Sequence, residues 1–381
     1  MSQRAYKAEI IPRVRRLVVK VGSAVLSDSA GLRHDIIERL ASDVTEIIKG
    51  GREVVVVTSG AIAAGRTRLS GRRGSSIVIR QAAASVGQIE LMGLYARFFA
   101  FHERTVAQVL LTHEDLAERE RCNNARHTIE TLLRAGIVPI VNENDTVAVE
   151  EIRFGDNDNL SALVANLVQA QMLVILSDVP GVLTADPRKR ADARLIPLIA
   201  DAEADMKGLV ADAAGPLGTG GMASKLTAAR RAAHAGVTVI ITSGLDERGL
   251  LDALEPDKNS GTLILAARDR LRSRKHWIAF ALKPAGALKL DSGAAEALRH
   301  KGRSLLPSGV HEVQGDFAGG DCVSLLDQDG AEFGRGLVNY PAADVIKVKG
   351  KRSGEISRVL GYKVADEIIH RDNLVLLSKA T

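Results

Sequence analysis

The first two thirds of the chain alternate short apolar runs with longer segments whose apolar residues recur at helical spacing. Runs such as VVVV and LVIL are typical of parallel strands that helices cover on both faces. The predicted strands are Leu17–Val21, Glu53–Thr58, Thr105–Leu111, Ile137–Val141, Met172–Ser177 and Val237–Thr242. Two further strands are expected at Glu151–Phe154 and near Gly181–Thr184, where the flanking turns favour a hairpin or a local excursion over core strands. The predicted helices are His34–Lys49, Ile79–Phe101, Asn123–Ala135, Leu160–Gln169 and Met222–Ala235. This order predicts an α/β fold, with a doubly wound, mostly parallel sheet sandwiched between helices.

The pattern changes after about Gly261. Residues 266–276 (AARDRLRSRKH) are dense in arginine and lack an apolar stripe, which predicts a basic linker. From Trp277 on, short segments punctuated by glycine predict a small β-rich barrel or sandwich. A length of 381 residues also favours two domains. We therefore predict domains at residues 1–265 and 277–381, joined by the linker.

The composition is that of an ordinary globular protein, with 46% hydrophobic and 25% charged residues. The net charge of +5 is mild, and 3% aromatic residues is too few for stacking many bases. The two cysteines lie far apart and predict neither a disulfide nor a metal cluster. No apolar run is long enough to span a membrane, and the basic N-terminal segment lacks the apolar core of a signal peptide. We expect a soluble, cytoplasmic protein.

Polar and glycine-rich motifs follow the predicted strands, where open α/β sheets bind their ligands. Lys20 closes a strand before Gly22, so its ammonium can lie beside phosphates, although such a lysine is often only structural. The segment Thr58–Gly65 follows the next strand, and its small residues leave room for a ligand. A tight turn with close helix packing explains that segment equally well.

Two further motifs predict recognition of charged small molecules. The segments Asn142–Asp145 and Gly155–Asn159 are denser in Asn and Asp than turns require, which favours a zwitterionic ligand over two turns and a helix cap. The segment Gly218–Lys225 opens a helix and is a candidate phosphate cradle, although its spacing is not that of a Walker A motif. Ser177–Asp178 and Asp186–Arg188 either hold a nucleotide or build loops.

Together and in this order, these motifs resemble the amino acid kinase superfamily and, within it, the glutamate 5-kinase family. The resemblance rests on KVGSAVL, VTSGAIAAG, VNENDTVA, FGDNDNLSALVA, SDVPGVLTADPR and LGTGGMASK. The last third resembles a PUA domain, through SLLPSGV and LGYKVADEIIHRDNLVLL. One departure is Ala24, where family members often carry a second hydroxyl residue.

The resemblance implies an ATP-dependent kinase that phosphorylates the γ-carboxylate of L-glutamate to L-glutamyl 5-phosphate. By resemblance, Lys20 stabilises the transferred phosphoryl group, Lys225 stabilises the leaving side and Asp158 orients both lysines. The implied glutamate-binding residues are Ser59, Asn142, Asp145, Asp156 and Asn157. The implied nucleotide-binding residues are Lys20, Gly22, Ser177, Asp178, Thr219, Gly220, Gly221, Met222 and Lys225. Mg²⁺ is expected to arrive with ATP, held mainly by phosphate oxygens and water, so no protein metal ligands are predicted.

The family context implies the first step of proline biosynthesis, with proline as a feedback inhibitor. It also implies hand-over of the product to glutamate-5-semialdehyde dehydrogenase and a homodimer or homotetramer. One alternative is a sibling kinase that acts on aspartate, N-acetylglutamate or carbamate. Another is RNA binding through the PUA-like domain, which is disfavoured because only Lys347–Arg352 offers a basic excess there.

Overall fold

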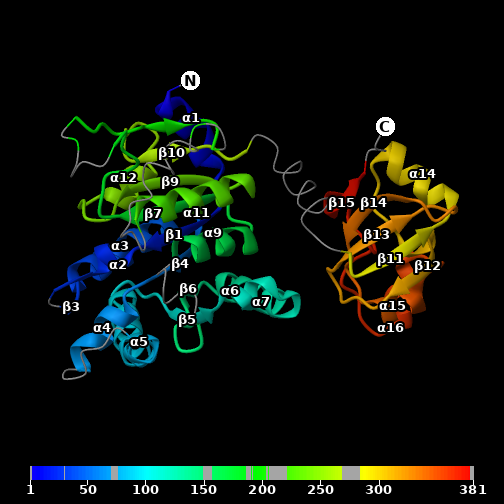
Figure 1. Cartoon of the computed structure of the whole chain (residues 1–381), viewed down its shortest axis with the longest axis horizontal. Helices are drawn as coiled ribbons and strands as arrows, with labels where there is room; N and C mark the ends of the chain where they lie inside the picture. The colour runs from blue at the N-terminus through cyan, green and yellow to red at the C-terminus, as the bar shows by residue number, and fades with distance from the viewer. Residues whose placement is uncertain are drawn as a thin grey trace. The chain divides into compact units, whose positions relative to one another are not determined.

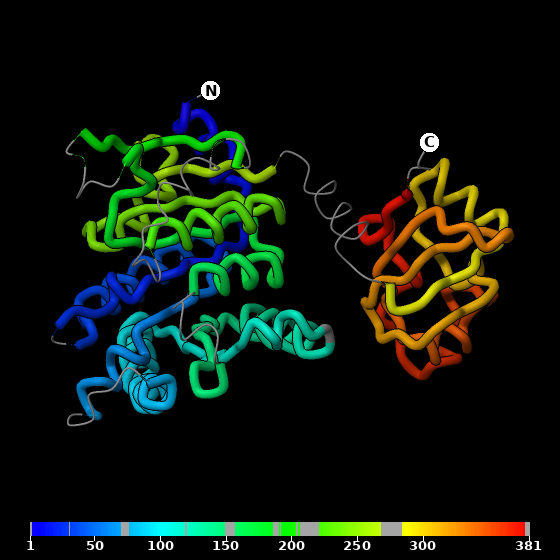
Figure 2. Tube along the Cα trace, in the orientation of Figure 1, coloured from blue at the N-terminus to red at the C-terminus, as the bar shows by residue number. Residues whose placement is uncertain are grey.

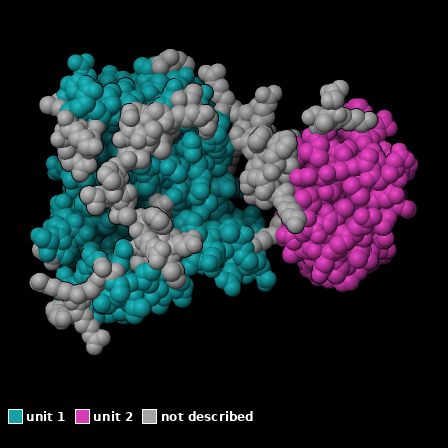
Figure 3. All heavy atoms as spheres, viewed as in Figure 1, with its two compact units in different colours: residues 1–268 teal, residues 269–381 magenta. Residues whose placement is uncertain are grey.

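The computed structural model describes residues 2–29, 31–69, 76–148, 157–185, 190, 192–202, 205, 221–267 and 284–377. The chain divides into two compact units, residues 1–268 and 269–381 (Figure 3). Most of the predicted linker at 266–276 lies outside the described residues, so the domain boundaries given above stay predictions. Among the candidate site residues, Asp156, Thr219, Gly220 and the segment Asp186–Arg188 also lie outside them.

In the described part of unit 1, eight strands form one sheet in the order β5-β6-β4-β1-β7-β9-β10-β8 (Figure 1). Their bounds are β1 Arg16–Val21, β4 Glu53–Val57, β5 Val106–Leu111, β6 Val138–Glu143, β7 Met172–Ser177, β8 Leu198–Ile199, β9 Thr238–Ser243 and β10 Thr262–Ile264. The pairings from β5 to β9 are all parallel, whereas β10 runs antiparallel to β9. Strand β1 lies between β4 and β7, so early and late segments of unit 1 meet in the middle of the sheet (Figure 2).

The six predicted strands are all present, and their ends differ from the predicted ones by at most about two residues. The short strands β8 and β10 were not predicted. A strand was also expected near Gly181–Thr184, and there the structure has only an isolated antiparallel bridge between Leu183 and Leu195. A further expected strand at Glu151–Phe154 lies outside the described residues.

Helices cover both faces of the sheet, and each face has its own apolar core. Helices α3, α5 and α12 pack on one face, and α7, α9 and α11 pack on the other. The bounds are α1 Gln3–Ile10, α2 Ser23–Leu26, α3 His34–Lys49, α4 Ala61–Arg68, α5 Ile77–Ala100, α6 His113–Ala117, α7 Arg119–Arg134, α9 Asn157–Leu167, α11 Met222–His234 and α12 Gly249–Ala253. A short 3-10 helix, η1 (Ile11–Arg13), and a small hairpin of β2 (Ser27–Asp28) and β3 (Gly31–Leu32) complete the unit. The predicted doubly wound, mostly parallel sandwich is confirmed.

Helix α9 begins at Asn157, three residues before the predicted start at Leu160. The two polar residues Asn157 and Asp158 therefore form its first turn instead of a preceding loop. A first turn tolerates such residues because its N–H groups lack helical partners and its dipole favours a carboxylate. This earlier start carries Asp158 into the core.

The described part of unit 2 contains a five-stranded sheet in the order β12-β11-β13-β14-β15. Its strands are β11 Gly286–Leu290, β12 Val310–Gly315, β13 Cys322–Leu326, β14 Glu332–Leu337 and β15 Leu374–Leu376. Its helices are α14 Ser292–Lys301, α15 Ala342–Val348 and α16 Ile356–Leu360, with 3-10 turns at η2 Pro307–Gly309, η3 Ser353–Glu355 and η4 Arg371–Asn373. These elements enclose a separate apolar core that includes Leu288, Val323 and Tyr340. The prediction of a small β-rich C-terminal domain is confirmed.

Across the described ranges, no helix combines the length and the hydropathy needed to cross a membrane.

Candidate active site

The carboxyl ends of the central parallel strands meet at one edge of the sheet, and most of the candidate residues lie there. Lys20 is near the end of β1, Ser59 follows β4, Asn142 is near the end of β6 and Ser177 ends β7. The sheet order places β6, β4, β1 and β7 side by side. The sequence motifs that end these strands are therefore neighbours in space.

Lys20, Asp158 and Lys225 form a buried charged cluster. Val18 packs in the core beneath α9 and α11, and Lys20, two residues further along β1, points to the same face. There Lys20 Nζ forms a short ion pair with Asp158 Oδ1, and Lys225 Nζ lies 3.5 Å from Asp158 Oδ2. The three residues are only 4%, 2% and 7% exposed, in that order. One carboxylate thus contacts two ammonium groups from different elements.

Ser224, which lies within the predicted phosphate cradle Gly218–Lys225, completes this cluster through a contact that the sequence did not indicate. Its hydroxyl donates a hydrogen bond of 2.6 Å to Asp158 Oδ2. Burial acts to raise the pKa of Asp158, but the charges of Lys20 and Lys225 and the hydrogen bonds from Lys20 and Ser224 outweigh it. The pKa of Asp158 therefore lies below its ordinary value, and the carboxylate is ionised at neutral pH. Two ammonium groups against one carboxylate leave the cluster a net positive charge.

The predicted nucleotide-binding residues lie around the charged cluster. A side chain added at Gly22 would place its Cβ 3.4 Å from Lys20 Nζ, so this glycine leaves space beside the ammonium. The Gly22 N–H donates to Leu176 O at 3.4 Å. Gly221 caps α11 and Met222 begins it, one turn before Lys225. This helix start, with a lysine in its first turn, suits a bound anion.

Ser177 and Asp178 lie at the end of β7. Ser177 is buried, and its hydroxyl donates a hydrogen bond of 3.1 Å to Asp178 Oδ1. Asp178 itself is exposed. Their contact joins neighbouring residues where β7 passes into the loop that follows it.

A second cluster of uncharged polar groups adjoins the first. Asn157 Nδ2 donates to Thr58 O at 2.6 Å, to Ser59 Oγ at 3.0 Å and to Asn142 Oδ1 at 2.9 Å. Asn142 is 1% exposed and Asn157 is 8% exposed. Because Asn157 and Asp158 are adjacent at the start of α9, the amide cluster and the charged cluster share one helix end.

Asp145 lies further along the chain, in the turn that follows β6, with its side chain half-buried. Three of the five predicted glutamate-binding residues, Ser59, Asn142 and Asn157, are thus in mutual contact. Gln88 on α5 also touches this group, because its Oε1 accepts a hydrogen bond of 2.8 Å from Asn142 Nδ2. Sequence reasoning missed Gln88, since a single glutamine in an apolar helix forms no motif.

The segment Thr58–Gly65 forms the tight turn with close helix packing that was weighed for it, and its part in ligand binding stays a prediction. Gly60 has a φ of 104°, a left-handed conformation that favours glycine in a tight turn. At Gly65 an added Cβ would lie 1.8 Å from the carbonyl oxygen of Ala83 on α5, so this glycine allows the close approach of α4 and α5. Ser59 in the same segment belongs to the amide cluster.

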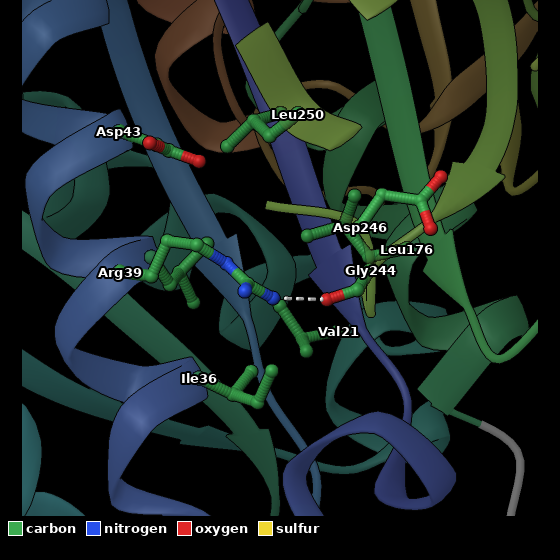
Figure 4. Close-up of a pocket in the computed structure, with 9 residues that line it drawn as sticks. Val21, Ile36, Arg39, Asp43, Leu176, Gly244, Asp246 and Leu250 are labelled. Carbon is green, nitrogen blue, oxygen red and sulfur yellow. Dashed lines mark hydrogen bonds between the residues drawn. The ribbon is translucent and has the colours of Figure 1, made fainter. Parts of the chain in front are cut away.

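A separate recess lies on the α3 face of the sheet (Figure 4). Arg39 reaches across it and donates a hydrogen bond of 2.7 Å to Gly244 O. Its lining consists of Val21, Ile36, Arg39, Leu40, Asp43, Leu176, Gly244, Asp246 and Leu250. None of the candidate site residues lines this recess, so it is distinct from the site described above.

Two family models match the chain. The model of the amino acid kinase family matches residues 15–243, and the model of the PUA domain matches residues 286–360. The chain belongs to the amino acid kinase family.

Curated relatives narrow this assignment. The chain is 48% identical to the glutamate 5-kinase of Geobacter sp. (strain M21), over 97% of this chain and 100% of the relative. It is 48% identical to that of Pelobacter propionicus over 97% of this chain and 100% of the relative. It is 49% identical to that of Nitrosococcus oceani over 95% of this chain and 97% of the relative. Within its family, the chain belongs to the glutamate 5-kinases.

Among solved structures, carbamate kinase from Giardia lamblia bound to AMP-PNP has a TM-score of 0.49 and 16% sequence identity. The match covers 66% of this chain and 98% of that one, and the similarity is too low to add to the assignment.

Proposed function

We propose that this chain transfers the γ-phosphoryl group of ATP to the γ-carboxylate of L-glutamate, giving L-glutamyl 5-phosphate and ADP. The relatives named glutamate 5-kinase, which match nearly the whole chain, support this reaction. The observation that carries it is the shared helix end, where the cluster of Lys20, Asp158 and Lys225 adjoins the amide cluster around Asn157. Ammonium groups that can bind a phosphoryl group and amides that can bind an amino acid thus lie side by side.

The reaction needs little acid–base chemistry. The γ-carboxylate is already ionised at neutral pH, so its oxygen can attack the γ-phosphorus without a general base. A phosphorus–oxygen bond to glutamate forms as the bond to ADP breaks. Catalysis then depends on alignment and on neutralising the charge of the transferred group. A pair of buried ammonium groups meets that second need.

We assign Lys20 to the transferred phosphoryl group and Lys225 to the leaving side, with Asp158 as the residue that orients both. Flexible lysines lose effectiveness unless they are held. The contacts from both Asp158 oxygens, together with the Ser224 hydroxyl, support this orienting role.

For glutamate we propose Ser59, Asn142, Asp145, Asp156 and Asn157 as binding residues. Amide and hydroxyl groups suit the carboxylates, and an acidic residue suits the α-ammonium group. The mutual contacts of Ser59, Asn142 and Asn157 support a common site.

For the nucleotide we propose Lys20, Gly22, Ser177, Asp178, Thr219, Gly220, Gly221, Met222 and Lys225. The substrate is the Mg²⁺ complex of ATP, whose metal is held mainly by phosphate oxygens and water. The space beside Lys20 at Gly22 and the start of α11 support a phosphate site.

We further propose that the reaction is the first step of proline biosynthesis and takes place in the cytoplasm. Proline shares the α-carboxylate and the ammonium group of glutamate, so we propose that it inhibits by occupying the same site. A homodimer or homotetramer and hand-over of the unstable acyl phosphate to glutamate-5-semialdehyde dehydrogenase complete the proposal.

The test is to incubate purified protein with Mg·ATP and hydroxylamine and to compare L-glutamate with aspartate, N-acetylglutamate and carbamate. Acyl phosphates react with hydroxylamine, so we expect hydroxamate with glutamate alone. Hydroxamate with another acid would assign the chain to a sibling activity. No turnover with any acid by folded protein would contradict the proposal.

A further inference from the structure

One face of α5 contacts the end of β6 and the turn that follows it. Gln81 Nε2 donates to Ala148 O at 3.2 Å, and the hydroxyls of Ser85 and Thr146 are 3.1 Å apart. Gln88 Oε1 accepts from Asn142 Nδ2 at 2.8 Å. Positions 81, 85 and 88 recur at helical spacing, so they share one face. This face borders the segment that carries Asn142 and Asp145.

Gln88 is also the middle of a chain of side-chain amides that runs from the surface into the site. Its Nε2 donates to Gln108 Oε1 at 3.1 Å, on the exposed side of β5. Its Oε1 accepts from Asn142 Nδ2, and Asn142 Oδ1 accepts from Asn157 Nδ2 at 2.9 Å. Each amide in this chain meets the complementary group of the next.

These hydrogen bonds between side-chain amides fix the orientation of the Asn142 amide. An asparagine amide has one accepting end and one donating end, and a reversal would set Asn142 Nδ2 against Asn157 Nδ2. The N–H of Glu143 donates to Asn142 Oδ1 at 2.9 Å and holds the oxygen end. Gln88 Oε1 accepts the hydrogen bond from Asn142 Nδ2. Asn142 is only 1% exposed, so this nitrogen is buried. Without an acceptor there, the buried donor would pull the amide away from this geometry.

We propose that Gln88 is a positioning residue for the acid substrate: by accepting the hydrogen bond from Asn142, it holds the amide cluster of Asn142, Asn157 and Ser59 in its binding arrangement. Gln88 acts through Asn142 and does not itself touch the reacting atoms. The inference rests on the proposed function, in which this cluster binds the acid. It assigns to α5 a part in substrate selection, in addition to its packing against α4.

The decisive variant is Gln88→Met in the full chain, because methionine has a similar length but no comparable acceptor. We expect the KM for the acid substrate to rise at least about fivefold, while the KM for ATP stays within about twofold. In an Asn142→Ala background the same change should alter the KM for the acid by less than about twofold, because its target is already gone. Ile89→Met on the same helix is the matched control, and it should leave both KM values within about twofold, because Ile89 is 78% exposed and its side chain carries no polar group.

Three results would each overturn the proposal. The first is an equal rise in the KM for the acid and the KM for ATP, and the second is an unchanged KM for the acid. The third is a double variant whose rise in the KM for the acid equals the product of the rises caused by Gln88→Met and Asn142→Ala. If Gln88→Met does not fold, as judged by circular dichroism, Gln88→Glu takes its place. Its carboxylate still accepts from Asn142, and the exposed Gln108 can turn its amide to donate. The KM for the acid should then stay within about threefold, and a tenfold rise would contradict the role.

The same assays separate this inference from the proposed function. The KM is measured for whichever acid the parent protein phosphorylates. A parent that uses aspartate instead of glutamate would refute the assigned substrate, and Gln88→Met would still test the positioning role. A parent that turns over no acid refutes both proposals.

Discussion

Burying a carboxylate is costly unless charges and hydrogen bonds compensate it, and Asp158 shows which residues do so. Its side chain is 2% exposed and contacts Lys20, Lys225 and Ser224. Since these partners keep its pKa low, its charge is retained down to acidic pH, and its stabilising contribution is lost only as the pH falls through that low value. In the proposed mechanism, the same contacts hold two ammonium groups in place for the phosphates of ATP.

Replacing Lys20 with alanine should lower kcat at least about tenfold, because the change removes the positive charge that is proposed to stabilise the transferred phosphoryl group. Asp158 keeps Lys225 and Ser224, so the fold should survive. The matched control is Lys7→Met, at a buried lysine whose ammonium donates to the backbone carbonyls of Asp252, Lys258 and Ser260. That change should lower the melting temperature and leave kcat within about twofold. Turnover of Lys20→Ala close to the parent would contradict the role of Lys20.

Asp43 on α3 offers a test of stability that lies outside the site. Burial raises the pKa of Asp43 to about 6, with Arg39 and Arg248 opposing the rise and Glu46 adding to it. The Asp43 carboxyl binds its proton more tightly in the folded protein than in the unfolded chain. Its ionisation therefore lowers the stability of the fold fully above about pH 6 and not at all below about pH 4.

Asp43→Asn should therefore stabilise the protein by about 1 to 2 kcal/mol near pH 7.5 and by much less near pH 4.5. The free energy of unfolding, measured in urea at both pH values, checks this. A gain that is equal at the two pH values would show that the charge of Asp43 is not its cause.

At the scale of elements, the crossing of α4 and α5 depends on two glycines. An added Cβ at Gly87 would lie 1.8 Å from the carbonyl oxygen of Ala61, and one at Gly65 would lie equally close to that of Ala83. Backbone therefore packs on backbone. The close approach brings α5 to the strand ends, where Tyr95 and Thr58 share a hydrogen bond of 2.7 Å between their hydroxyls.

Gly87→Ala should destabilise the protein by at least about 2 kcal/mol, because the methyl group overlaps backbone that cannot move aside. Gly93→Ala on the same helix is the control. Nothing lies within 4 Å of an added Cβ there, so the change should stabilise α5 by about 0.5 to 1 kcal/mol. Thermal unfolding of both variants measures the difference. A harmless Gly87→Ala would mean that the two helices do not cross so closely.

The elements also show what a sequence can predict. Apolar runs identified six strands, and the signal is clearest for β1, β4, β7 and β9, because a buried parallel strand has few other possible patterns. Strands β8 and β10, with two and three residues, are too short for any periodicity. The start of α9 was placed too late because Asn157 and Asp158 look like loop residues until tertiary contacts show why they are helical.

For the candidate site, strand ends and glycine loops indicated where to look, and Lys20, Asp158 and Lys225 come together there. What the sequence could not show is which polar residue meets which. The sequence placed Ser224 in the candidate phosphate cradle without indicating its contact with Asp158. It did not single out Gln88, whose contact with Asn142 depends on how α5 packs against the sheet.

At the scale of the whole molecule, the two units have separate apolar cores, and every candidate site residue lies in unit 1. A fragment of residues 1–267 should therefore fold alone and form hydroxamate from glutamate, with kcat and KM within about threefold of the full chain. Circular dichroism and the hydroxamate assay check both points. A fragment that is folded but inactive would assign the C-terminal unit a part in catalysis.

The ion pair between Lys20 and Asp158 joins residues 138 positions apart, and the strand β1 that carries Lys20 pairs with β7 from much later in the chain. Such contacts form slowly during folding, because long loops must close before any of them is made. A chain with its helices formed but without the pairing of β1 and β7 has no assembled charged cluster. The recovery of activity after denaturation therefore requires that β1 has paired with β7.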